Sequence, residues 1–210
     1  VVCAPRQFDH TDGCGFIFSA SDITDRKKME ETIWHQANYD SLTELPNRNL
    51  FSDRLSEALI SAKRRGTEFA LVFIDLDNFK NINDSLGHAA GDKVLQQAAE
   101  RIANCLRESD SVARLGGDEF VLLLPSDEGR TNYDRVTQRV LGRLAESFHP
   151  TSIEVYASGS IGLAIYPHDG DDSDTLMMNA DTAMYQAKQA GRNQISYYSQ
   201  SMSSELKALL

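Results

Sequence analysis

Two acidic segments hold the residues of this sequence that could do chemistry. In one of them, the glycine pair Gly116-Gly117 is followed by Asp118 and Glu119 and then by an apolar run over 121–124. Adjacent glycines readily take positive φ, which a two-residue hairpin turn requires, so we expect a hairpin with two carboxylates directly after its tip. A carboxylate pair on a rigid turn can bind a hard cation, although a solvated hairpin tip explains the same residues.

The other acidic segment follows an apolar run. Residues 69–74 are continuously apolar, which predicts a strand buried on both faces, and Asp75, Leu76 and Asp77 come next. Residues two apart on a strand point to the same side of the sheet. Buried carboxylates resist desolvation, and bound Mg²⁺ or Mn²⁺ would relieve that cost. A helix N-cap at Asp77-Asn78 explains one of the two acids, not both.

The two segments form one cation site if their strands are neighbours. Adjacent strands lie about 4.8 Å apart, so Asp75 and Asp118 could then bind the same ion. Enzymes that catalyse phosphoryl and nucleotidyl transfer use a metal ion to bridge phosphates and activate a hydroxyl group. The sequence therefore favours a nucleotide as the substrate.

Further residues suit the two ends of a nucleotide. Lys80 lies one helical turn from the acidic strand end, and Lys188 and Arg192 end a predicted helix, where they suit a triphosphate. Favourable charge at a helix C-terminus also explains Lys188 and Arg192. Asn83 and Asp92 offer the donors and acceptors that a guanine edge requires. P-loop and His-Glu-x-x-His patterns are absent from the sequence.

Composition and charge limit the class of function. The chain has 210 residues, 41% of them hydrophobic and 25% charged, which is typical of a globular protein with an ordinary core. Its 31 acidic and 21 basic residues give a net charge of −10, which disfavours binding to nucleic acid or to an anionic membrane. No apolar run approaches the ~18 residues of a membrane span. A phosphate substrate would need a metal and local cations.

The N-terminus and the cysteines favour a cytoplasmic location. Val-Val-Cys-Ala-Pro is not a signal peptide, and without an initiator Met the chain is expected to be a piece of a longer protein. Cys3, Cys14 and Cys105 make neither a disulfide framework nor a zinc pattern. We therefore expect a reducing compartment and no membrane contact in this chain, although the parent protein could be membrane-attached.

Hydrophobic periodicity predicts the elements that position these groups. Helices are expected from the face formed by Phe51, Leu55 and Leu59, and over 92–106, 132–148 and 174–190. Strands are expected over 69–74, 111–115, 120–124, 153–166 and 194–198. The order β-α-β-β-α-β is ferredoxin-like, so we predict an α+β fold with a central, mainly antiparallel sheet flanked by helices.

The first 38 residues have a different pattern. Residues 1–8 and 14–20 read as two strands around a turn at 10–13, and because two strands alone are marginal as a fold, they indicate the end of a truncated domain. Residues 25–38 read as a helix with Met29, Ile33 and Ala37 on one stripe. This helix is a connector, a dimerising helix, or a helix packed on its own domain.

Several separated motifs identify residues 38–199, about three quarters of the chain, as resembling a GGDEF domain. This diguanylate cyclase fold is related to adenylyl cyclase and polymerase palm domains. Besides the Gly116-Gly117 hairpin, the motifs are Asp40-x-Leu42-Thr43-x-Leu45-Pro46-Asn47-Arg48, Phe73-Ile74-Asp75-Leu76-Asp77-x-Phe79-Lys80-x-Ile82-Asn83-Asp84, Gly87-His88-x-x-Gly91-Asp92 and Ala187-Lys188-x-x-Gly191-Arg192-Asn193.

The resemblance implies a role for each candidate residue. Asp75, Asp118 and the carbonyl of Leu76 would hold Mg²⁺ or Mn²⁺, and Glu119 would assist the metal or deprotonate a 3′-hydroxyl. Asn83 and Asp92 would bind the guanine end of GTP, and Lys80, Lys188 and Arg192 the triphosphate. Phe79 would also bind the substrate. The implied reaction condenses two GTP into cyclic di-GMP with release of two pyrophosphates, in a homodimer whose copies each hold one GTP.

A second site is implied by Arg107-Glu108-Ser109-Asp110, which matches the family's Arg-x-x-Asp inhibitory motif. Arg107 would bind product phosphate and Asp110 a guanine edge of cyclic di-GMP. An exposed Arg–Asp pair at a helix end is the alternative.

The flanking segments resemble parts of neighbouring domains. Residues 1–23 resemble the last strands of a PAS sensor domain, 24–38 a connector helix, 39–199 the GGDEF domain and 200–210 the start of a linker to an EAL phosphodiesterase domain. A regulatory GTP-binding module that controls such a phosphodiesterase, without turnover of its own, is therefore the alternative to an active cyclase.

Overall fold

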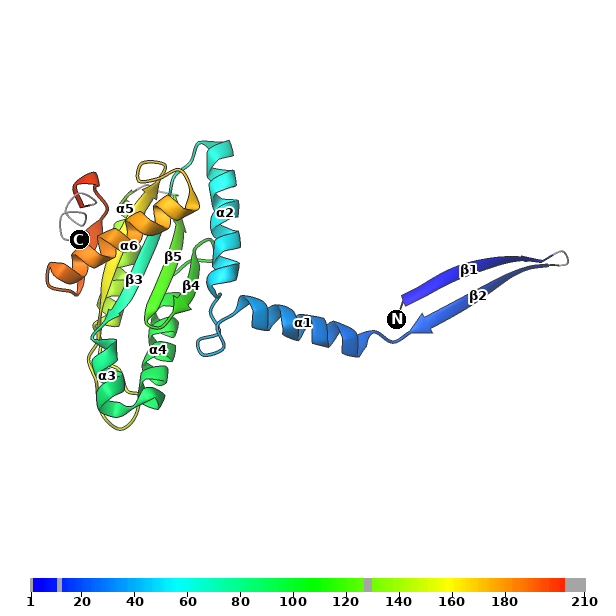
Figure 1. Ribbon diagram of the computed structural model, residues 1–210, viewed down its shortest axis with the longest axis horizontal. Helices are drawn as coiled ribbons and strands as arrows, with labels where there is room; N and C mark the ends of the chain where they lie inside the picture. Colours follow the sequence, from blue (N-terminus) through cyan, green and yellow to red (C-terminus); the bar gives the residue numbers. More distant parts are fainter. Residues whose placement is uncertain (1, 11–12, 127–129, 203–210) are drawn as a thin grey trace. The chain divides into compact units, whose positions relative to one another are not determined.

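The computed structural model describes residues 2–10, 13–126 and 130–202. The chain divides into two compact units, Val1–Asn38 and Tyr39–Leu210 (Figure 1). The predicted turn residues Thr11 and Asp12 and most of the predicted linker, 203–210, lie outside the described residues.

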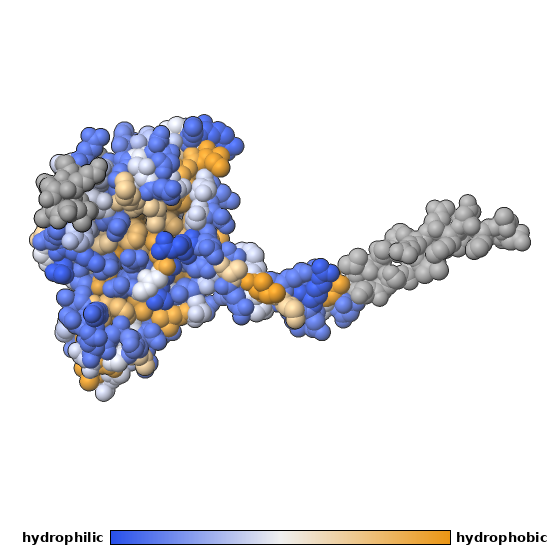
Figure 2. Space-filling model, in the orientation of Figure 1, coloured by the Kyte–Doolittle hydropathy of each residue, from blue (hydrophilic) through white to orange (hydrophobic). Residues whose placement is uncertain are grey.

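The first unit consists of a hairpin and a helix. Strands β1 (Val2–His10) and β2 (Gly13–Ser21) pair antiparallel, and α1 (Thr24–Asn38) follows, as the sequence predicts. No residue of α1 is buried, and the side chains of Met29 and Ile33 are 65% and 59% exposed. Figure 2 shows hydrophobic atoms among the hydrophilic surface of this helix. The predicted stripe of apolar residues on this helix is thus exposed.

The second unit is built on a five-stranded sheet with the order β4-β5-β3-β6-β7. Its strands are β3 (Phe69–Asp77), β4 (Ser111–Gly116), β5 (Glu119–Pro125), β6 (Ser158–Tyr166) and β7 (Gln194–Tyr197). All neighbouring pairs are antiparallel except β6–β7, which is parallel. The α+β prediction with a mainly antiparallel, ferredoxin-like sheet is therefore confirmed.

Helices cover both faces of this sheet (Figure 1). Helices α2 (Arg48–Arg65) and α6 (Ser173–Gln189) pack on the face that carries Phe69, Leu71 and Phe73. Helices α4 (His88–Ala103) and α5 (Arg130–Leu144), together with the short α3 (Phe79–Leu86), share a core with Ile74 and Leu76 on the other face. Because strand residues alternate between faces, Asp75 and Asp77 lie on the α2–α6 face.

The sequence predictions differ from the structure at several element ends. The strand predicted over 153–166 begins only at Ser158, and the residues before it form a loop with an isolated bridge between Phe148 and Val155. The helix predicted over 92–106 runs from His88 to Ala103, and the one over 132–148 ends at Leu144. The short helix α3 was indicated only by the N-cap interpretation of Asp77-Asn78 and by the position of Lys80, because an eight-residue helix offers little periodicity.

Gly162 of β6 sets the spacing between the sheet and α6. A Cβ atom at this position would lie 2.1 Å from the backbone nitrogen of Met184 and 2.2 Å from the carbonyl oxygen of Ala180. Real Cβ atoms essentially never come this close to backbone, so glycine allows the helix to lie directly on the strand. No helix among the described residues is long and apolar enough to cross a membrane.

Candidate active site

The sheet register brings the two acidic segments together. Strand β3 lies beside β5, and Asp75 pairs with Glu119 across the two strands. Beyond this pair, the backbone N–H of Leu76 donates to the carbonyl of Asp118 over 3.3 Å. The condition that the sequence left open, neighbouring strands for Asp75 and Asp118, is thus met.

The tip of the β4–β5 hairpin is one residue further along than the sequence predicts. Gly116 is the last residue of β4 and pairs with Glu119, so the turn consists of Gly117 and Asp118 rather than of the two glycines. A register irregularity between Arg114 and Gly116 causes this shift. Both glycines have positive φ, 144° and 53°, as expected for this turn. Asp118 therefore projects from the turn itself.

A pocket of about 230 Å³ opens where β3, the hairpin, α3 and the end of α6 meet. Its lining contains three of the four candidate metal ligands, all but Glu119, and all three candidate phosphate-binding cations. The lining residues are Asp75, Leu76, Asp77, Asn78, Phe79, Lys80, Asn81, Asp118, Lys188 and Arg192. Carboxylates and cations from four separate elements thus meet in one concave site, which we call the acidic pocket. This is the arrangement that recognition of a metal–phosphate group requires.

Asp75 is buried and already has a cationic partner. The residue is 7% exposed, and its Oδ2 lies 2.8 Å from Nζ of Lys188. Burial, together with the nearby carboxylates of Asp118 and Asp77, raises the pKa of Asp75 to about 6, although the ion pair with Lys188 lowers it. The Asp75 carboxylate is therefore short of positive charge despite its lysine.

Asp77, two residues on, has a structural role. It is 2% exposed and accepts hydrogen bonds from the hydroxyls of Ser158 and Ser160, at 2.6 and 2.7 Å, and from the backbone N–H of Asn193 at 3.1 Å. The N-cap interpretation is wrong in detail, because Asn78 occupies the N-cap position of α3 and its side chain makes no capping hydrogen bond. Asp77 instead ties the end of β3 to β6 and to the loop before β7.

Glu119 lies on the same face of the sheet as Asp75, because residues paired across strands share a face. It is partly exposed. Burial raises the pKa of its carboxyl, as do the charges of Asp181 and Asp118, while Arg48 and Lys188 oppose the shift. A carboxyl with a raised pKa can take up a proton near neutral pH more readily than an ordinary one.

The donor set of the pocket fits a divalent cation. Asp75 and Asp118 supply carboxylates, and Leu76 supplies a backbone carbonyl at the same strand end. No cluster of three or more His, Cys, Asp or Glu side chains that could hold a metal occurs within 13–126 and 130–202 or the described part of β1. Two carboxylates with the remaining positions left to water and phosphate is the usual pattern for Mg²⁺.

The candidate guanine-binding residues lie where α3 meets α4, which we call the helical corner (Asn83, Gly91 and Asp92). A Cβ atom on Gly91 would lie 1.9 Å from Oδ1 of Asn83, so the asparagine side chain rests directly against this glycine. Phe79 is 8% exposed and its ring also contacts Gly91. Asp92 follows on the exposed side of α4. Asn83 and Asp92 do not line the acidic pocket, whereas Phe79 does.

Arg107 and Asp110 lie together in the connection between α4 and β4. Oδ2 of Asp110 accepts from the backbone N–H of Arg107 over 2.9 Å, and the Arg107 guanidinium donates to Oδ1 of Asn132 over 3.0 Å. Arg135 donates to the same oxygen. The two predicted residues are thus adjacent to each other, and neither lines the acidic pocket.

Arg114 and Asp40 have a role that the sequence reasoning missed. The Arg114 guanidinium donates to the carbonyl of Gly117 from Nε and Nη2, at 3.0 and 2.7 Å, and pairs with Asp40 at 2.8 Å. Burial opposes ionisation of Asp40, but hydrogen bonds from Thr43 and Arg114 outweigh it and lower the pKa. The conformation of the hairpin turn is therefore held from the loop before α2. Asp40 begins one of the motifs quoted above and Arg114 lies two residues before Gly116, which was the available signal.

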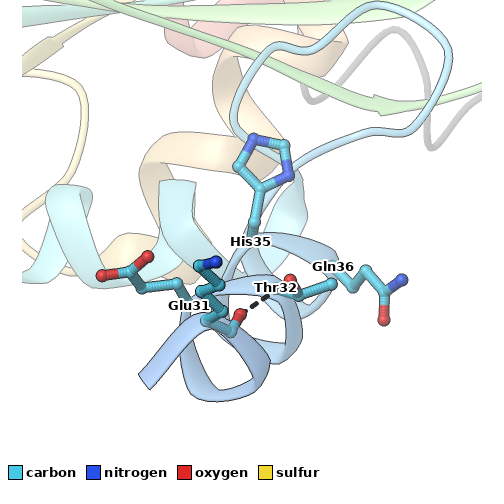
Figure 3. A pocket seen from close by; sticks show the side chains of 5 residues that line it. Glu31, Thr32, His35 and Gln36 are labelled. Atoms are coloured by element: carbon cyan, nitrogen blue, oxygen red, sulfur yellow. Dashed lines mark hydrogen bonds between the residues drawn. The ribbon is translucent and has the colours of Figure 1, made fainter. Parts of the chain in front are cut away.

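A larger hollow, of about 600 Å³, lies on α1 and lacks these properties. It is lined by Lys28, Glu31, Thr32, His35 and Gln36, all from one helix (Figure 3). Within it, the Thr32 hydroxyl donates to the carbonyl of Lys28, an ordinary contact along a helix. No residues from separate elements converge there, so the smaller acidic pocket is the better candidate site.

Comparison with known proteins identifies the domain. Residues 37–194 match the model of the family described as "Diguanylate cyclase, GGDEF domain". The chain belongs to the GGDEF family. The solved GGDEF domain of TpbB (or YfiN) from Pseudomonas aeruginosa superimposes with a TM-score of 0.77 at 43% identity, covering 80% of this chain and 99% of that one. The coiled coil and GGDEF domain of DgcB from Caulobacter crescentus, in complex with c-di-GMP, superimposes with a TM-score of 0.76 at 28% identity, covering 83% and 93%.

The curated relatives differ in activity. Diguanylate cyclase TpbB of P. aeruginosa is 46% identical over 77% of this chain and 37% of its own length. The bifunctional diguanylate cyclase/cyclic di-GMP phosphodiesterase MucR of the same species is 45% identical over 83% and 25%. Cyclic di-GMP phosphodiesterase PdeR of Escherichia coli is 40% identical over 89% and 28%. The chain thus spans between 25% and 37% of the length of these proteins.

Proposed function

We propose that the second unit is an active diguanylate cyclase, which condenses two GTP into cyclic di-GMP and releases two pyrophosphates. The observation that carries this proposal is the pocket in which Asp75 and Asp118 lie among Lys80, Lys188 and Arg192. The similarity to TpbB supports the same conclusion. In the reaction, the 3′-hydroxyl of each GTP attacks the α-phosphorus of the other, so that two phosphodiester bonds form and each attack releases one pyrophosphate.

The residues in and beside the pocket have three different roles: metal binding, triphosphate binding and proton transfer. Asp75, Asp118 and the Leu76 carbonyl hold Mg²⁺ or Mn²⁺, which polarises the phosphate oxygens when bound. Lys80, Lys188 and Arg192 bind the triphosphate. Glu119, with its raised pKa, receives the proton of the attacking hydroxyl or assists the metal.

The helical corner binds the base. Asn83 and Asp92 hydrogen-bond the guanine edge, and Phe79 packs beside it. One GTP binds per domain, so the two reacting nucleotides meet only when two copies of the chain face each other. Arg107 and Asp110 bind cyclic di-GMP as an inhibitor, in the same region as Asn132 and Arg135.

The parts of the chain outside 39–199 connect the cyclase to other domains. Residues 1–23 are the end of a PAS domain, 24–38 connect it to the GGDEF domain, and 200–210 lead to an EAL domain. This part of the protein acts in the cytoplasm, whether or not the parent protein is attached to a membrane. The similarity to the much longer MucR and PdeR supports a multidomain parent.

Product formation tests the proposal. Purified chain is incubated with GTP and Mg²⁺, and cyclic di-GMP is measured by chromatography at several protein concentrations. We expect a rate per molecule that rises with protein concentration, because the reaction needs two copies, and loss of product when EDTA removes the metal. Tight GTP binding without product at high protein concentration would refute an active cyclase.

A second function is a GTP-binding module that regulates an attached phosphodiesterase. The 40% identity to the phosphodiesterase PdeR favours it. In that case GTP binds without turnover, and in the full-length parent protein GTP changes the rate at which cyclic di-GMP is hydrolysed. Product formation by the isolated chain would exclude this alternative.

A further inference from the structure

The ion pair between Lys188 and Asp75 has a consequence for metal binding. Lys188 comes from the last turn of α6, and its ammonium lies 2.8 Å from Oδ2 of Asp75. The two side chains are 28% and 10% exposed, so this is a largely desolvated contact. A lysine at this distance uses a carboxylate oxygen that a metal ion would coordinate.

The electrostatics of the pocket explain why the lysine lies there. Burial raises the pKa of Asp75, and also those of Glu119 and Asp181, while Lys188 opposes the shift at all three. Its single charge thus serves three carboxylates in the nucleotide-free protein. Because unpaired buried carboxylates are unfavourable, the lysine remains at Asp75 until another cation replaces it.

We propose that Lys188 is an internal competitor of the metal ion, which occupies Asp75 until nucleotide phosphates draw its ammonium away. This inference rests on the proposed metal and phosphate sites. Metal alone must displace the lysine from Asp75, and the ion pair between the two side chains is then lost with no phosphate contact in exchange. Metal bound to a nucleotide brings phosphates that accept the displaced ammonium, so the two ligands bind together more readily than the metal binds alone.

The competition predicts opposite effects of one substitution on two ligands. If the Asp75 oxygen is free of lysine in only about a tenth of the molecules, metal affinity is reduced about tenfold. Lys188→Met removes the competitor, so nucleotide-free protein should bind Mn²⁺ about tenfold more tightly. The same variant loses a phosphate contact and should bind Mn²⁺–GTP more weakly.

Arg192→Met is the matched control. Arg192 lines the same pocket and carries the same charge, so its removal changes the local field in the same direction. It is Lys188, however, whose ion pair with Asp75 is seen in the structure. Arg192→Met should therefore weaken Mn²⁺–GTP binding but change the affinity for Mn²⁺ alone by less than about threefold.

The test is a titration with Mn²⁺, with and without GTP, in which free Mn²⁺ is measured by electron paramagnetic resonance. The proteins titrated are wild type, Lys188→Met, Lys188→Gln, Arg192→Met and Asp75→Asn. Circular dichroism checks that each variant is folded. We expect tighter Mn²⁺ binding in both Lys188 variants and its loss in Asp75→Asn. Unchanged or weaker Mn²⁺ binding by both Lys188 variants, or an equal gain in Arg192→Met, would overturn the inference.

These titrations are independent of turnover. If wild type makes cyclic di-GMP while the Lys188 variants bind Mn²⁺ as wild type does, the competition is refuted and the proposed activity stands. If the Lys188 variants bind Mn²⁺ more tightly as expected while wild type forms no product, the proposed activity fails and the competition stands.

Discussion

The acidic pocket and the helical corner are assembled in different ways. The pocket brings together β3, the hairpin, α3 and the end of α6. Its residues are far apart in the sequence, from Asp75 to Arg192. The helical corner is formed by two consecutive helices, whose Asn83 and Gly91 are close in sequence. The pocket therefore depends on the tertiary fold, and the corner on local helix packing.

The two regions also differ in electrostatics. Burial disfavours the charged form of Asp75, and its structural partner is a lysine. At the corner, the Asn83 amide is neutral and rests against a glycine. We infer that the buried carboxylate of the pocket is stabilised when a metal and phosphates bind, whereas the corner supplies the shape and the hydrogen-bonding groups that hold the base. Changes in the pocket should act mainly on kcat, and changes at the corner mainly on KM.

The largest effect is expected for Asp75→Asn. Loss of a metal ligand should lower kcat for cyclic di-GMP formation by on the order of 10³, because metal stabilisation of developing charge contributes several kcal/mol. Folding should be preserved, since a buried carboxylate is replaced by a neutral amide of the same shape. Steady-state kinetics and thermal unfolding measure both effects.

Asp77→Asn is the control on the same strand. It should lower stability by about 1–3 kcal/mol, because the hydroxyls of Ser158 and Ser160 lose a charged acceptor. Asp75→Asn should be the more harmful to turnover and Asp77→Asn the more harmful to stability. The reverse ranking would contradict the roles assigned to the two acids.

The second effect is a pH dependence of stability in metal-free protein. An unfolded Asp75 carboxyl loses its proton near its ordinary pKa of 3.8, whereas the folded one keeps it to about 6. The folded state thus binds more protons in this interval, so the free energy of unfolding should fall as the pH rises from about 4 to about 6. The Asp75 contribution is roughly 2–3 kcal/mol.

Urea unfolding of wild type and Asp75→Asn in EDTA, at pH values from 4 to 7, isolates this contribution. The wild type should lose stability relative to the variant as the pH rises through this interval. A constant difference between the two proteins would show that the Asp75 carboxylate is not strained in the folded state.

The third effect is expected at Arg114, which holds the hairpin turn. Arg114→Lys keeps the charge but cannot reproduce the two hydrogen bonds to the Gly117 carbonyl together with the contact to Asp40. We expect kcat to fall about 10–100-fold, as for partners that orient metal ligands. Asp40→Asn removes less of this contact and should cost less. A wild-type kcat in Arg114→Lys would show that the turn needs no such support.

The smallest effect is expected at the helical corner. The added Cβ of Gly91→Ala would collide with the Asn83 amide, so KM for GTP should rise about tenfold with a modest loss of stability of about 1–3 kcal/mol. Gly142→Ala in α5 is the matched control, because a Cβ there meets no atom within 4 Å. It should leave kinetics unchanged and stabilise the helix by roughly 0.5–1 kcal/mol. A kcat effect without a KM effect in Gly91→Ala would break the division between the two regions.

Sequence patterns predicted the strand that carries Asp75, the hairpin and the helix that carries Lys188, because these elements have strong apolar periodicity. The position of the turn was missed by one residue, because the irregularity between Arg114 and Gly116 depends on strand pairing. Residues 153–157 have a composition that resembles a strand, yet they form a loop before β6. Strand propensity depends on packing against a sheet, which composition alone does not reveal.

The partners of charged residues could not be predicted from the sequence. Asp77 and its serines are separated by about eighty residues, and Lys188 and Asp75 by more than a hundred. Only the sheet order β5-β3-β6 and the placement of α6 bring these groups together. Motifs therefore indicated which residues matter, while the structure separates Asp77, which is hydrogen-bonded to serines of β6, from Asp75, which pairs with a lysine of the pocket.

Because α6 lies so close to Gly162, this position determines where α6, and with it Lys188, lies relative to the sheet. The helix that rests on Gly162 through Ala180 and Met184 ends, one turn later, at the lysine that contacts Asp75. A methyl group at position 162 would lift the whole helix from the sheet. Selection for catalysis would thus act on a residue that contacts no ligand, and drift at this buried position could silence the domain while its signature motifs remained intact.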